Sequence, residues 1–243
     1  LPIGVVGARL SDEFLWSEII LLSALNLAAG NGVIIVVPHL EAISVQWALK
    51  ILQQSGAPEN LVLLLQDTDG QSSKLLAAHP GISAFLCRGL DKENEKLIQT
   101  AFQKKKKTQY FGGSKNSCLI HPDYDFESNF DKIMTPFLVG GGQLSVNCHR
   151  LFITQSVEKK FYDLLVSYFE KQKNEVELRQ PSNKQIWESY LPQISQDSGK
   201  ILWGGKSTAE LKVQATWTRD LSNCSVMQQE SLAAPLFIIT AVK

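Results

Sequence analysis

Short apolar runs alternate with stretches of helical spacing through the first half of the chain. The runs occupy residues 3–6, 33–37, 61–65 and 82–87. They lack regular polar alternation, which is typical of strands buried on both faces of a parallel sheet. The segments between and after them, residues 16–29, 44–54, 72–78 and 92–103, repeat apolar residues at helical spacing. This order predicts a doubly wound, Rossmann-like α/β unit.

The pattern changes at Gly112-Gly113, where we place a domain boundary. Beyond it, strands are expected at residues 117–120, 151–154, 201–203, 211–217 and 236–239. Helices are expected at residues 125–138, 158–171 and 185–194. The sequence therefore predicts two domains, residues 1–111 and residues 112–243, the second also of mixed α/β type.

Charge and composition exclude several classes of partner. The chain carries 24 basic and 24 acidic side chains and is 44% hydrophobic, as expected of a globular protein. We expect no nucleic-acid partner, because no net positive charge attracts phosphates. We expect no membrane partner, because no apolar run approaches the ~20 residues of a membrane span. The lysine run at residues 104–107 is interpreted as a solvated helix end.

The four cysteines are Cys87, Cys118, Cys148 and Cys224, and they are widely spaced. They form no CxxC pair and no cluster with zinc-ligand spacing, so we expect no metal site. A disulfide framework is not expected either, and a reducing, cytoplasmic setting fits best. The chain lacks an initiator Met and ends after an apolar run, which favours an excerpt of a longer polypeptide.

Six segments, in order, resemble motifs of the aldehyde dehydrogenase superfamily. They correspond to its entry strand, its Ala-Ala-Gly-Asn segment, the approach to its cofactor turn, its nucleophile loop, its late Gly-Gly pair and its Glu-x-Phe-Gly-Pro signature. In this chain they are residues 2–6, 27–31 with Pro38, 79–82 running to Gly89, 142–143 with 150–153, Gly204-Gly205, and Glu230 with Pro235. Within the superfamily, the nucleophile loop and the last motif most resemble those of succinylglutamate-semialdehyde dehydrogenase.

The resemblance implies a cofactor-type domain over residues 1–111 and a catalytic-type domain over residues 112–243. It covers the whole chain, but only about the middle half of a family member. The first domain would be incomplete at its N-terminus and the second at its C-terminus. Family members oligomerise, so a homo-oligomer is expected of the parent chain, with a protein partner or the missing segments as further partners.

The family's catalytic residues are replaced at the matching positions. Ser145 occupies the position of the cysteine nucleophile, and a hydroxyl needs an adjacent base to attack. Cys148 is an alternative thiol, one helical turn further on if the segment is helical. Phe111 lies where the resemblance places the general base, and Glu13 where it places the oxyanion-binding Asn. A phenyl ring accepts no proton, and a carboxylate repels an oxyanion.

The cofactor positions are also altered. Val37 replaces the Lys that would contact the ribose. The turn before the next helix keeps Gly89, but Leu90 and Asn94 replace its Ser and second Gly. Asp91 then disfavours a pyrophosphate at the helix start.

The late ribose-binding Glu aligns with Ser231, with Glu230 one residue away as a substitute. Gly89 and Glu230 are therefore the candidate cofactor contacts. We expect no cofactor, or NAD or NADP if binding survives in altered form.

Three functions remain open. The leading hypothesis is an aldehyde-dehydrogenase-like pseudoenzyme with a structural or partner-binding role. The alternative is an active NAD(P)-dependent dehydrogenase acting on a semialdehyde, with Cys148 as displaced nucleophile. A third is an esterase-like activity of Ser145 with His149, for which no third residue that would orient the histidine is evident.

Overall fold

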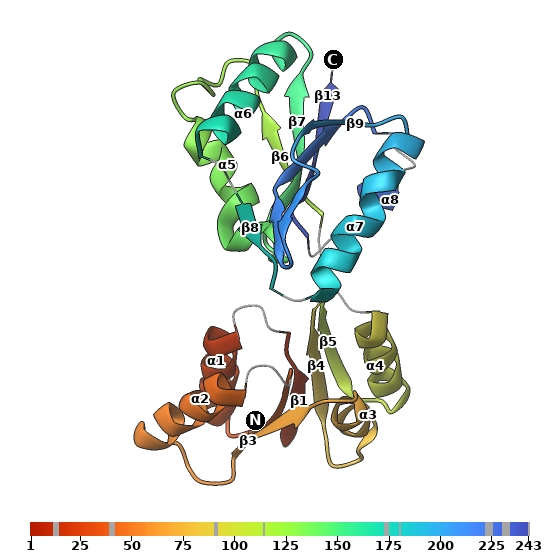
Figure 1. The fold of residues 1–243 in the computed structure, drawn as a ribbon. Coiled ribbons are helices and arrows are strands. Elements are labelled where there is room, and N and C mark those ends of the chain that lie inside the picture. Colours follow the sequence, from red (N-terminus) through yellow and green to blue (C-terminus); the bar gives the residue numbers. More distant parts are fainter. Residues whose placement is uncertain are drawn as a thin grey trace. The chain divides into compact units, whose positions relative to one another are not determined.

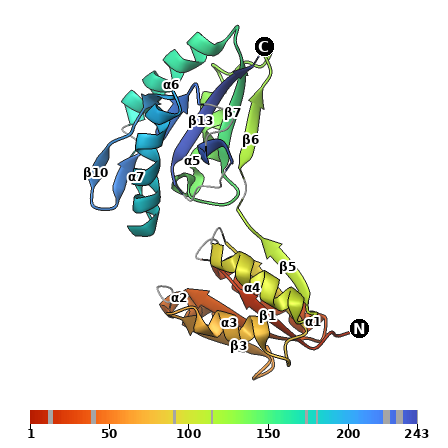
Figure 2. The ribbon, with the colours of Figure 1, turned by 90° about the vertical axis from the view of Figure 1, so that its right-hand side faces the viewer.

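The computed structural model divides the chain into two compact units, Leu1–Gly112 and Gly113–Lys243. It describes residues 1–11, 15–38, 42–89, 92–113, 115–172, 175–179, 181–221, 226–229 and 234–242. Each unit has its own sheet and its own core, so each is considered by itself (Figures 1 and 2).

Strands and helices alternate strictly through the first unit (Figure 1). Its strands form one five-stranded sheet in the order β3-β2-β1-β4-β5, and every pair is parallel. The elements are β1 (Val5–Arg9), α1 (Leu15–Ala28), β2 (Gly32–Pro38), α2 (Ala42–Gln54), β3 (Val62–Asp67), α3 (Gln71–Ala78), β4 (Ala84–Arg88), α4 (Lys92–Gln103) and β5 (Lys107–Phe111). The predicted doubly wound α/β fold is confirmed.

Two apolar clusters lie on opposite faces of this sheet. On one face, Val33 and Ile35 of β2 pack with Ile19 of α1 and Ala48 of α2. On the other face, residues of β4 pack with α3 and α4. The sheet is covered by helices on both faces, which explains why its strands carry little polar alternation.

Two predictions fail at the end of this unit. Strand β5 was not expected, because Lys107, Gln109 and their neighbours read as polar and β5 is a half-exposed edge strand. The lysine run is not a solvated helix end throughout, since Lys106 is buried. Its ammonium donates to the carbonyls of His79 and Ile82, and burial lowers its pKa. Lys106 therefore anchors the start of β5 to the segment that precedes β4.

The second unit contains a mixed sheet and a small antiparallel one. The five-stranded sheet has the order β6-β7-β13-β12-β9, in which only β9 is antiparallel, and the small sheet has the order β10-β11-β8. The elements are β6 (Asn116–Ile120), α5 (Phe130–Leu138), η2 (Val139–Gly142), β7 (Cys148–Thr154), α6 (Glu158–Gln172), β8 (Glu175–Glu177), α7 (Pro181–Gln196), β9 (Lys200–Trp203), β10 (Ser207–Ala209), β11 (Lys212–Gln214), β12 (Thr216–Arg219), α8 (Val226–Gln229) and β13 (Leu236–Val242).

An aromatic cluster forms the centre of this core. The rings of Trp217 and Phe237 lie 4.7 Å apart between centroids, and that of Phe137 lies 5.0 Å from Trp217. All three side chains are fully buried. Because Phe137 belongs to α5 and the other two belong to adjacent strands, the cluster fixes the helix that leads into the following loop.

The structure corrects two boundaries in this unit. The helix predicted at residues 125–138 begins only at Phe130, and residues 126–129 form turns. The strand predicted at residues 211–217 is two strands, β11 and β12, which belong to different sheets. The three-residue strands β8 and β10 were missed, since such short pairings leave no periodic signal.

Each unit should lose stability independently of the other. Trp217→Ala removes the ring at the centre of the second core, and Phe85→Ala removes a fully buried ring of the first core. Each substitution should cost about 3–5 kcal/mol. Hydrogen–deuterium exchange should then accelerate only in residues 113–243 for Trp217→Ala and only in residues 1–112 for Phe85→Ala. Accelerated exchange in both units of either variant would contradict two separate cores.

Candidate functional site

The strand order of the first sheet reverses between β1 and β4. In doubly wound folds, ligands bind outside the carboxyl ends of the strands at such a switch point. Here that edge is formed by Arg9 at the end of β1 and Arg88 at the end of β4. The first candidate site is therefore the carboxyl edge of the sheet beside these two arginines.

Gly89 opens the turn after β4, where its φ of 123° favours glycine. A Cβ at this position would lie 3.0 Å from Nδ2 of Asn94 and 3.3 Å from Cβ of Ser11. Asn94 is fully buried, donates to the carbonyl of Arg88 at 3.2 Å, and accepts a hydrogen bond from the guanidinium of Arg9. The side chain of Asn94 thus occupies the space against the turn.

The second arginine at this edge of the sheet, Arg88, also interacts with other side chains of the unit. The guanidinium of Arg88 forms an ion pair with Glu18 of α1, and both side chains are largely buried. It also lies 5.6 Å from the ring centroid of Phe111. Phe111, at the general-base position, therefore contributes a ring face to a cation and supplies no proton acceptor.

The remaining positions of the cofactor prediction divide into two groups. Val37 lies near the end of β2 with its side chain buried, so it offers no polar contact to a ribose. Glu13 and Glu230, like Leu90, Asp91 and Ser231, lie outside the described residues. Among the described positions, the side chain of Asn94 lies directly against the turn at Gly89.

The second candidate site is the loop between α5 and β7, which carries the position of the expected nucleophile. Gly140, Gly141 and Gly142 have φ values of 60°, 70° and 68°. A Cβ on Gly142 would lie 2.6 Å from the ring of Phe237 and 3.0 Å from the carbonyl oxygen of Phe137. Only glycine fits there, so the loop turns tightly against the aromatic cluster.

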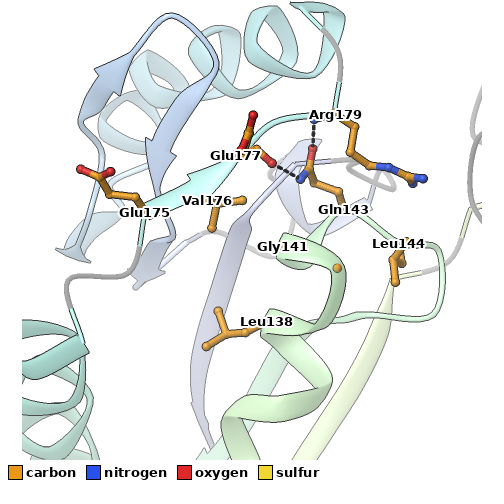
Figure 3. Close-up of a pocket in the computed structure, with 9 residues that line it drawn as sticks. Leu138, Gly141, Gln143, Leu144, Glu175, Val176, Glu177 and Arg179 are labelled. Atoms are coloured by element: carbon orange, nitrogen blue, oxygen red, sulfur yellow. Dashed lines mark hydrogen bonds between the residues drawn. The ribbon is translucent and has the colours of Figure 1, made fainter. Parts of the chain in front are cut away.

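Gln143 anchors this loop to β8 and to the start of α7 (Figure 3). Its Nε2 donates to the carbonyl of Glu177 at 3.0 Å. Its Oε1 accepts from the backbone N–H of Arg179 at 3.0 Å and from Nδ2 of Asn183 at 3.1 Å. The buried amide is thereby satisfied at both ends, and Gln143 has a positioning role in the loop.

The side chain of Asn147 links backbone groups at both ends of the loop through hydrogen bonds. Its fully buried side chain accepts from the N–H of Leu144 at 2.7 Å. It donates to the carbonyls of Pro136 at 3.1 Å and Val139 at 2.9 Å. Nδ2 of Asn116 in turn donates to the carbonyl of Asn147 at 3.1 Å. Two asparagines therefore replace the backbone hydrogen bonds that the irregular loop cannot make.

The two candidate nucleophiles do not lie on one helix. Ser145 lies in a turn with its side chain half-buried, and Cys148 is the first residue of strand β7. The conditional prediction of one helical turn between them is wrong, because Asn147 ends the loop and β7 pairs with β6 from Cys148 onward. Burial, and to a lesser degree Cys118, raises the pKa of the Cys148 thiol. A raised pKa leaves less thiolate at neutral pH.

His149 is buried and packs into the core. Its Nε2 donates to the carbonyl of Gly142 at 3.3 Å, and its ring stacks on Phe237 at 6.0 Å between centroids. Burial, with a smaller contribution from the charge of Lys115, lowers its pKa to about 4. Because successive side chains of a strand point to opposite faces, His149 and Cys148 face apart and do not form a base–thiol couple.

A cavity of about 470 Å³ lies behind the loop (Figure 3). Its lining residues are Leu138, Gly140, Gly141, Gln143, Leu144, Glu175, Val176, Glu177 and Arg179. Among these nine, none carries a thiol, imidazole or hydroxyl group. Glu175, Glu177 and Arg179 are exposed at its edge, so charges of both signs meet solvent there. The cavity supplies polar and charged contacts and no thiol or hydroxyl nucleophile.

Metal-binding and membrane features are not found in the described part of the chain. No group of three or more His, Cys, Asp or Glu side chains converges there to hold a metal ion. No helix built from those residues is long and apolar enough to cross a membrane.

The residues that organise both sites are mainly ones that sequence reasoning missed. Arg9, Asn116 and Asn147 belong to none of the sequence motifs described above, and Asn94 stands out in the sequence only as the replacement of a glycine. Their sequence signal is weak, since a buried asparagine and a surface asparagine look alike in a single sequence.

Comparison with known proteins identifies relatives of both units together. The model of the aldehyde dehydrogenase family matches residues 1–243. An aldehyde dehydrogenase-like protein of Schizosaccharomyces pombe is 24% identical over 163 residues, which is 67% of this chain and 33% of that protein. The chain thus spans about a third of this relative.

Solved structures with the same fold include two bacterial dehydrogenases. An apo betaine aldehyde dehydrogenase mutant of Staphylococcus aureus matches with a TM-score of 0.91 and 17% identity, over 100% of this chain and 51% of that one. An NAD+ complex of aldehyde dehydrogenase from Bacillus cereus matches with a TM-score of 0.90 and 18% identity, over 100% and 52%. At such identities these matches show the fold, and the chain spans about half of each.

Removal of the Asn147 amide should loosen the loop. Asn147→Ala leaves the N–H of Leu144 and two carbonyls without their partner, so the free energy of unfolding should fall by about 2–4 kcal/mol. Urea denaturation measures this change. Asn129→Ala, which removes two exposed hydrogen bonds at the start of α5, is the control and should cost less than about 1 kcal/mol. Equal losses in the two variants would contradict the role given to Asn147.

Acid should destabilise the second unit through His149. Its pKa is about 4 when folded and 6.5 when unfolded, so its contribution to stability is complete above pH 6.5 and is lost as the pH falls toward 4. Between pH 7 and 4.5, wild type should lose ~2 kcal/mol more than His149→Gln. His121→Gln removes an exposed histidine and should behave like wild type. Parallel pH dependences of wild type and His149→Gln would contradict this assignment.

Proposed function

This chain belongs to the aldehyde dehydrogenase family, and from that premise we propose that it keeps the family fold without the dehydrogenase chemistry. It then serves as a structural or partner-binding domain. The observation that carries the proposal is the set of hydrogen bonds that Asn94 makes to Arg9 and Arg88 at the carboxyl ends of β1 and β4. There Asn94 and Arg9 bond to each other in the place where a doubly wound fold would receive a dinucleotide phosphate.

The contacts of Arg88 and Val37 at the same edge of the sheet also support a loss of cofactor binding. Arg88 is held by Glu18 and Phe111, so its charge is already paired. Val37 gives a ribose no hydrogen bond. A phosphate entering beside Gly89 would have to displace Asn94 and break its bonds to Arg9 and Arg88, and a buried polar group left unpaired costs about 1–3 kcal/mol.

The nucleophile loop supports the same proposal from the second unit. Ser145 needs a base to attack a carbonyl, and the buried His149 ring is hydrogen-bonded to Gly142. At the general-base position, Phe111 is a hydrocarbon ring. The loop itself is held by hydrogen bonds, because the side chains of Gln143 and Asn147 bond to backbone N–H groups of Arg179 and Leu144. A hydrogen-bonded loop without its chemistry suits a domain that presents a surface.

An active NAD(P)-dependent dehydrogenase is the second candidate, and Cys148 is the observation that favours it. Its thiol is partly exposed and lies three residues beyond the expected nucleophile position. Its raised pKa weighs against it, since aldehyde attack requires the thiolate. We rank this candidate second for that reason.

The setting that we propose is reducing and cytoplasmic. It is supported by Cys87, Cys118 and Cys148, the three described cysteines, which are all free thiols. Cys224 lies outside the described residues.

Cofactor binding tests the proposal directly. NAD+ and NADP+ should leave the thermal unfolding of the chain unchanged and give no saturable heat in calorimetry. A tight site would stabilise the fold by ~2.7 kcal/mol at a hundredfold excess over its dissociation constant, so real binding is easily detected. The Bacillus cereus enzyme, which has been solved with NAD+, serves as positive control. Saturable binding that is weakened by Gly89→Val would contradict the proposal and favour the second candidate.

A further inference from the structure

Strand β8 lies at the end of the small sheet of the second unit. Among the described strands it pairs with β11 alone, in the order β10-β11-β8. The backbone N–H of Leu178, directly after β8, donates to the carbonyl of Leu211 at 2.7 Å, on the β11 side. In an antiparallel pair, successive residues direct their backbone groups to opposite edges. The N–H and C=O groups of Glu175 and Glu177 therefore point away from β11, and we call this side the outer edge of β8.

The side chain of Gln143 already imitates a peptide group at the outer edge (Figure 3). Its Nε2 donates to the carbonyl of Glu177, and its Oε1 accepts from the N–H of Arg179. A neighbouring strand would make the same two bonds, to a carbonyl and to an N–H two residues further on. The next such pair along the edge is the carbonyl of Glu175 and the N–H of Glu177. Within the described part of the chain, no hydrogen bond reaches either group.

The cavity of about 470 Å³ lies beside this pair of backbone groups. The three residues of β8 line one side of it, and the glycine loop that precedes Gln143 lines another. Leu138, Leu144 and Val176 give it apolar walls. Ligand pockets in proteins commonly measure roughly 300–1,000 Å³, so the cavity has room for part of an extended peptide.

We propose that the outer edge of β8 binds an extended peptide segment of a partner protein by strand addition. A backbone carbonyl of the segment accepts from the N–H of Glu177, and a backbone N–H of the segment donates to the carbonyl of Glu175. In such recognition, main-chain hydrogen bonds supply affinity and alternate side chains supply specificity. An apolar side chain of the segment lies in the cavity, against Leu138 and Val176.

The charges of β8 indicate the chemistry of the partner. Glu175 and Glu177 are exposed on one face of the strand, whereas Val176 is buried on the other. Opposite charges on neighbouring strands stabilise their pairing, and like charges destabilise it. Lys212 of β11 already lies opposite Glu177. The residue opposite Glu175 is the neutral Gln214. The partner segment therefore alternates basic and apolar residues, with a basic residue beside Glu175.

A second copy of β8 is a poor occupant of the same edge. Two β8 strands side by side would bring glutamates against glutamates, and charged side chains on an edge strand oppose such pairing. The inference rests on the partner-binding role proposed above and names the partner's chemistry. It involves neither Gly89 nor Cys148, so peptide binding and cofactor binding are tested separately and either can fail alone.

Peptide titration followed by calorimetry and by the NMR spectrum of the backbone amides tests the site. The probe is the blocked peptide acetyl-Lys-Val-Lys-Val-Lys-amide. Wild type should bind it saturably, and the amide proton of Glu177 should shift downfield as it gains an acceptor. The acidic peptide acetyl-Glu-Val-Glu-Val-Glu-amide should bind at least about tenfold more weakly, because its charges oppose those of β8.

Substitution at Glu177 separates the backbone bond from the charge. Glu177→Pro removes the N–H of the outer edge, and proline is tolerated in an edge strand where that N–H points away from the ladder. Glu177→Ala is the matched control, since it removes the same carboxylate and keeps the N–H. The proline variant should bind the basic peptide at least about tenfold more weakly than the alanine variant. Circular dichroism should show both variants folded.

A charge reversal tests the site without altering the backbone. Glu175→Lys should weaken binding of the basic peptide and strengthen binding of the acidic one. Glu59→Lys makes the same change of net charge at an exposed position of the first unit and should leave both affinities unchanged.

Three outcomes overturn the proposal. One is the absence of saturable binding of the basic peptide to wild type. Another is equal binding by folded Glu177→Pro and Glu177→Ala. The third is an equal effect of Glu175→Lys and Glu59→Lys, which would mean that the peptide responds to net charge alone. Weaker binding by Glu177→Pro than by Glu177→Ala, with a reversed peptide preference in Glu175→Lys, supports strand addition at β8.

Discussion

Strands of a parallel sheet are apolar on both faces, and this constraint organises the first unit. Helices must cover each face, and the crossovers that bring them there set the strand order β3-β2-β1-β4-β5. The order reverses between β1 and β4, so the carboxyl ends of these two strands are where a doubly wound fold receives a ligand. The same constraint makes the exposed apolar residues of α1 conspicuous, because a helix without a polar side is suited to burial on every side.

Within this frame the two candidate sites share one property. In each, an amide side chain occupies the place where chemistry would be expected. Asn94 bonds to Arg9 beside Gly89, and Asn147 bonds to three backbone groups of the loop that carries Ser145. Such contacts favour one rigid conformation of each segment. The account of a fold retained without its reaction depends on these contacts.

The sequence allowed the fold of the first unit to be predicted because β2 and β4 are apolar runs separated by helical spacing. It did not reveal β5, whose residues are polar because the strand lies at an exposed edge. Nor did it reveal that β11 and β12 belong to different sheets, because their pairing partners are distant along the chain. The motif around Gln143 predicts that Ser145 takes the nucleophile position, and this assignment stays a prediction. The role of Asn147 could not be predicted, because it depends on three backbone groups that only the folded loop brings together.

The most direct test of this account is whether aldehyde oxidation occurs at all. NADH fluorescence should be followed at high concentrations of the chain with NAD+ and an aldehyde such as propanal or betaine aldehyde, beside Cys148→Ala. The account predicts no NADH, even in the first turnover, and identical traces for the two proteins. A burst of NADH that is stoichiometric with wild type and absent in Cys148→Ala would contradict it, and would establish Cys148 as a working nucleophile.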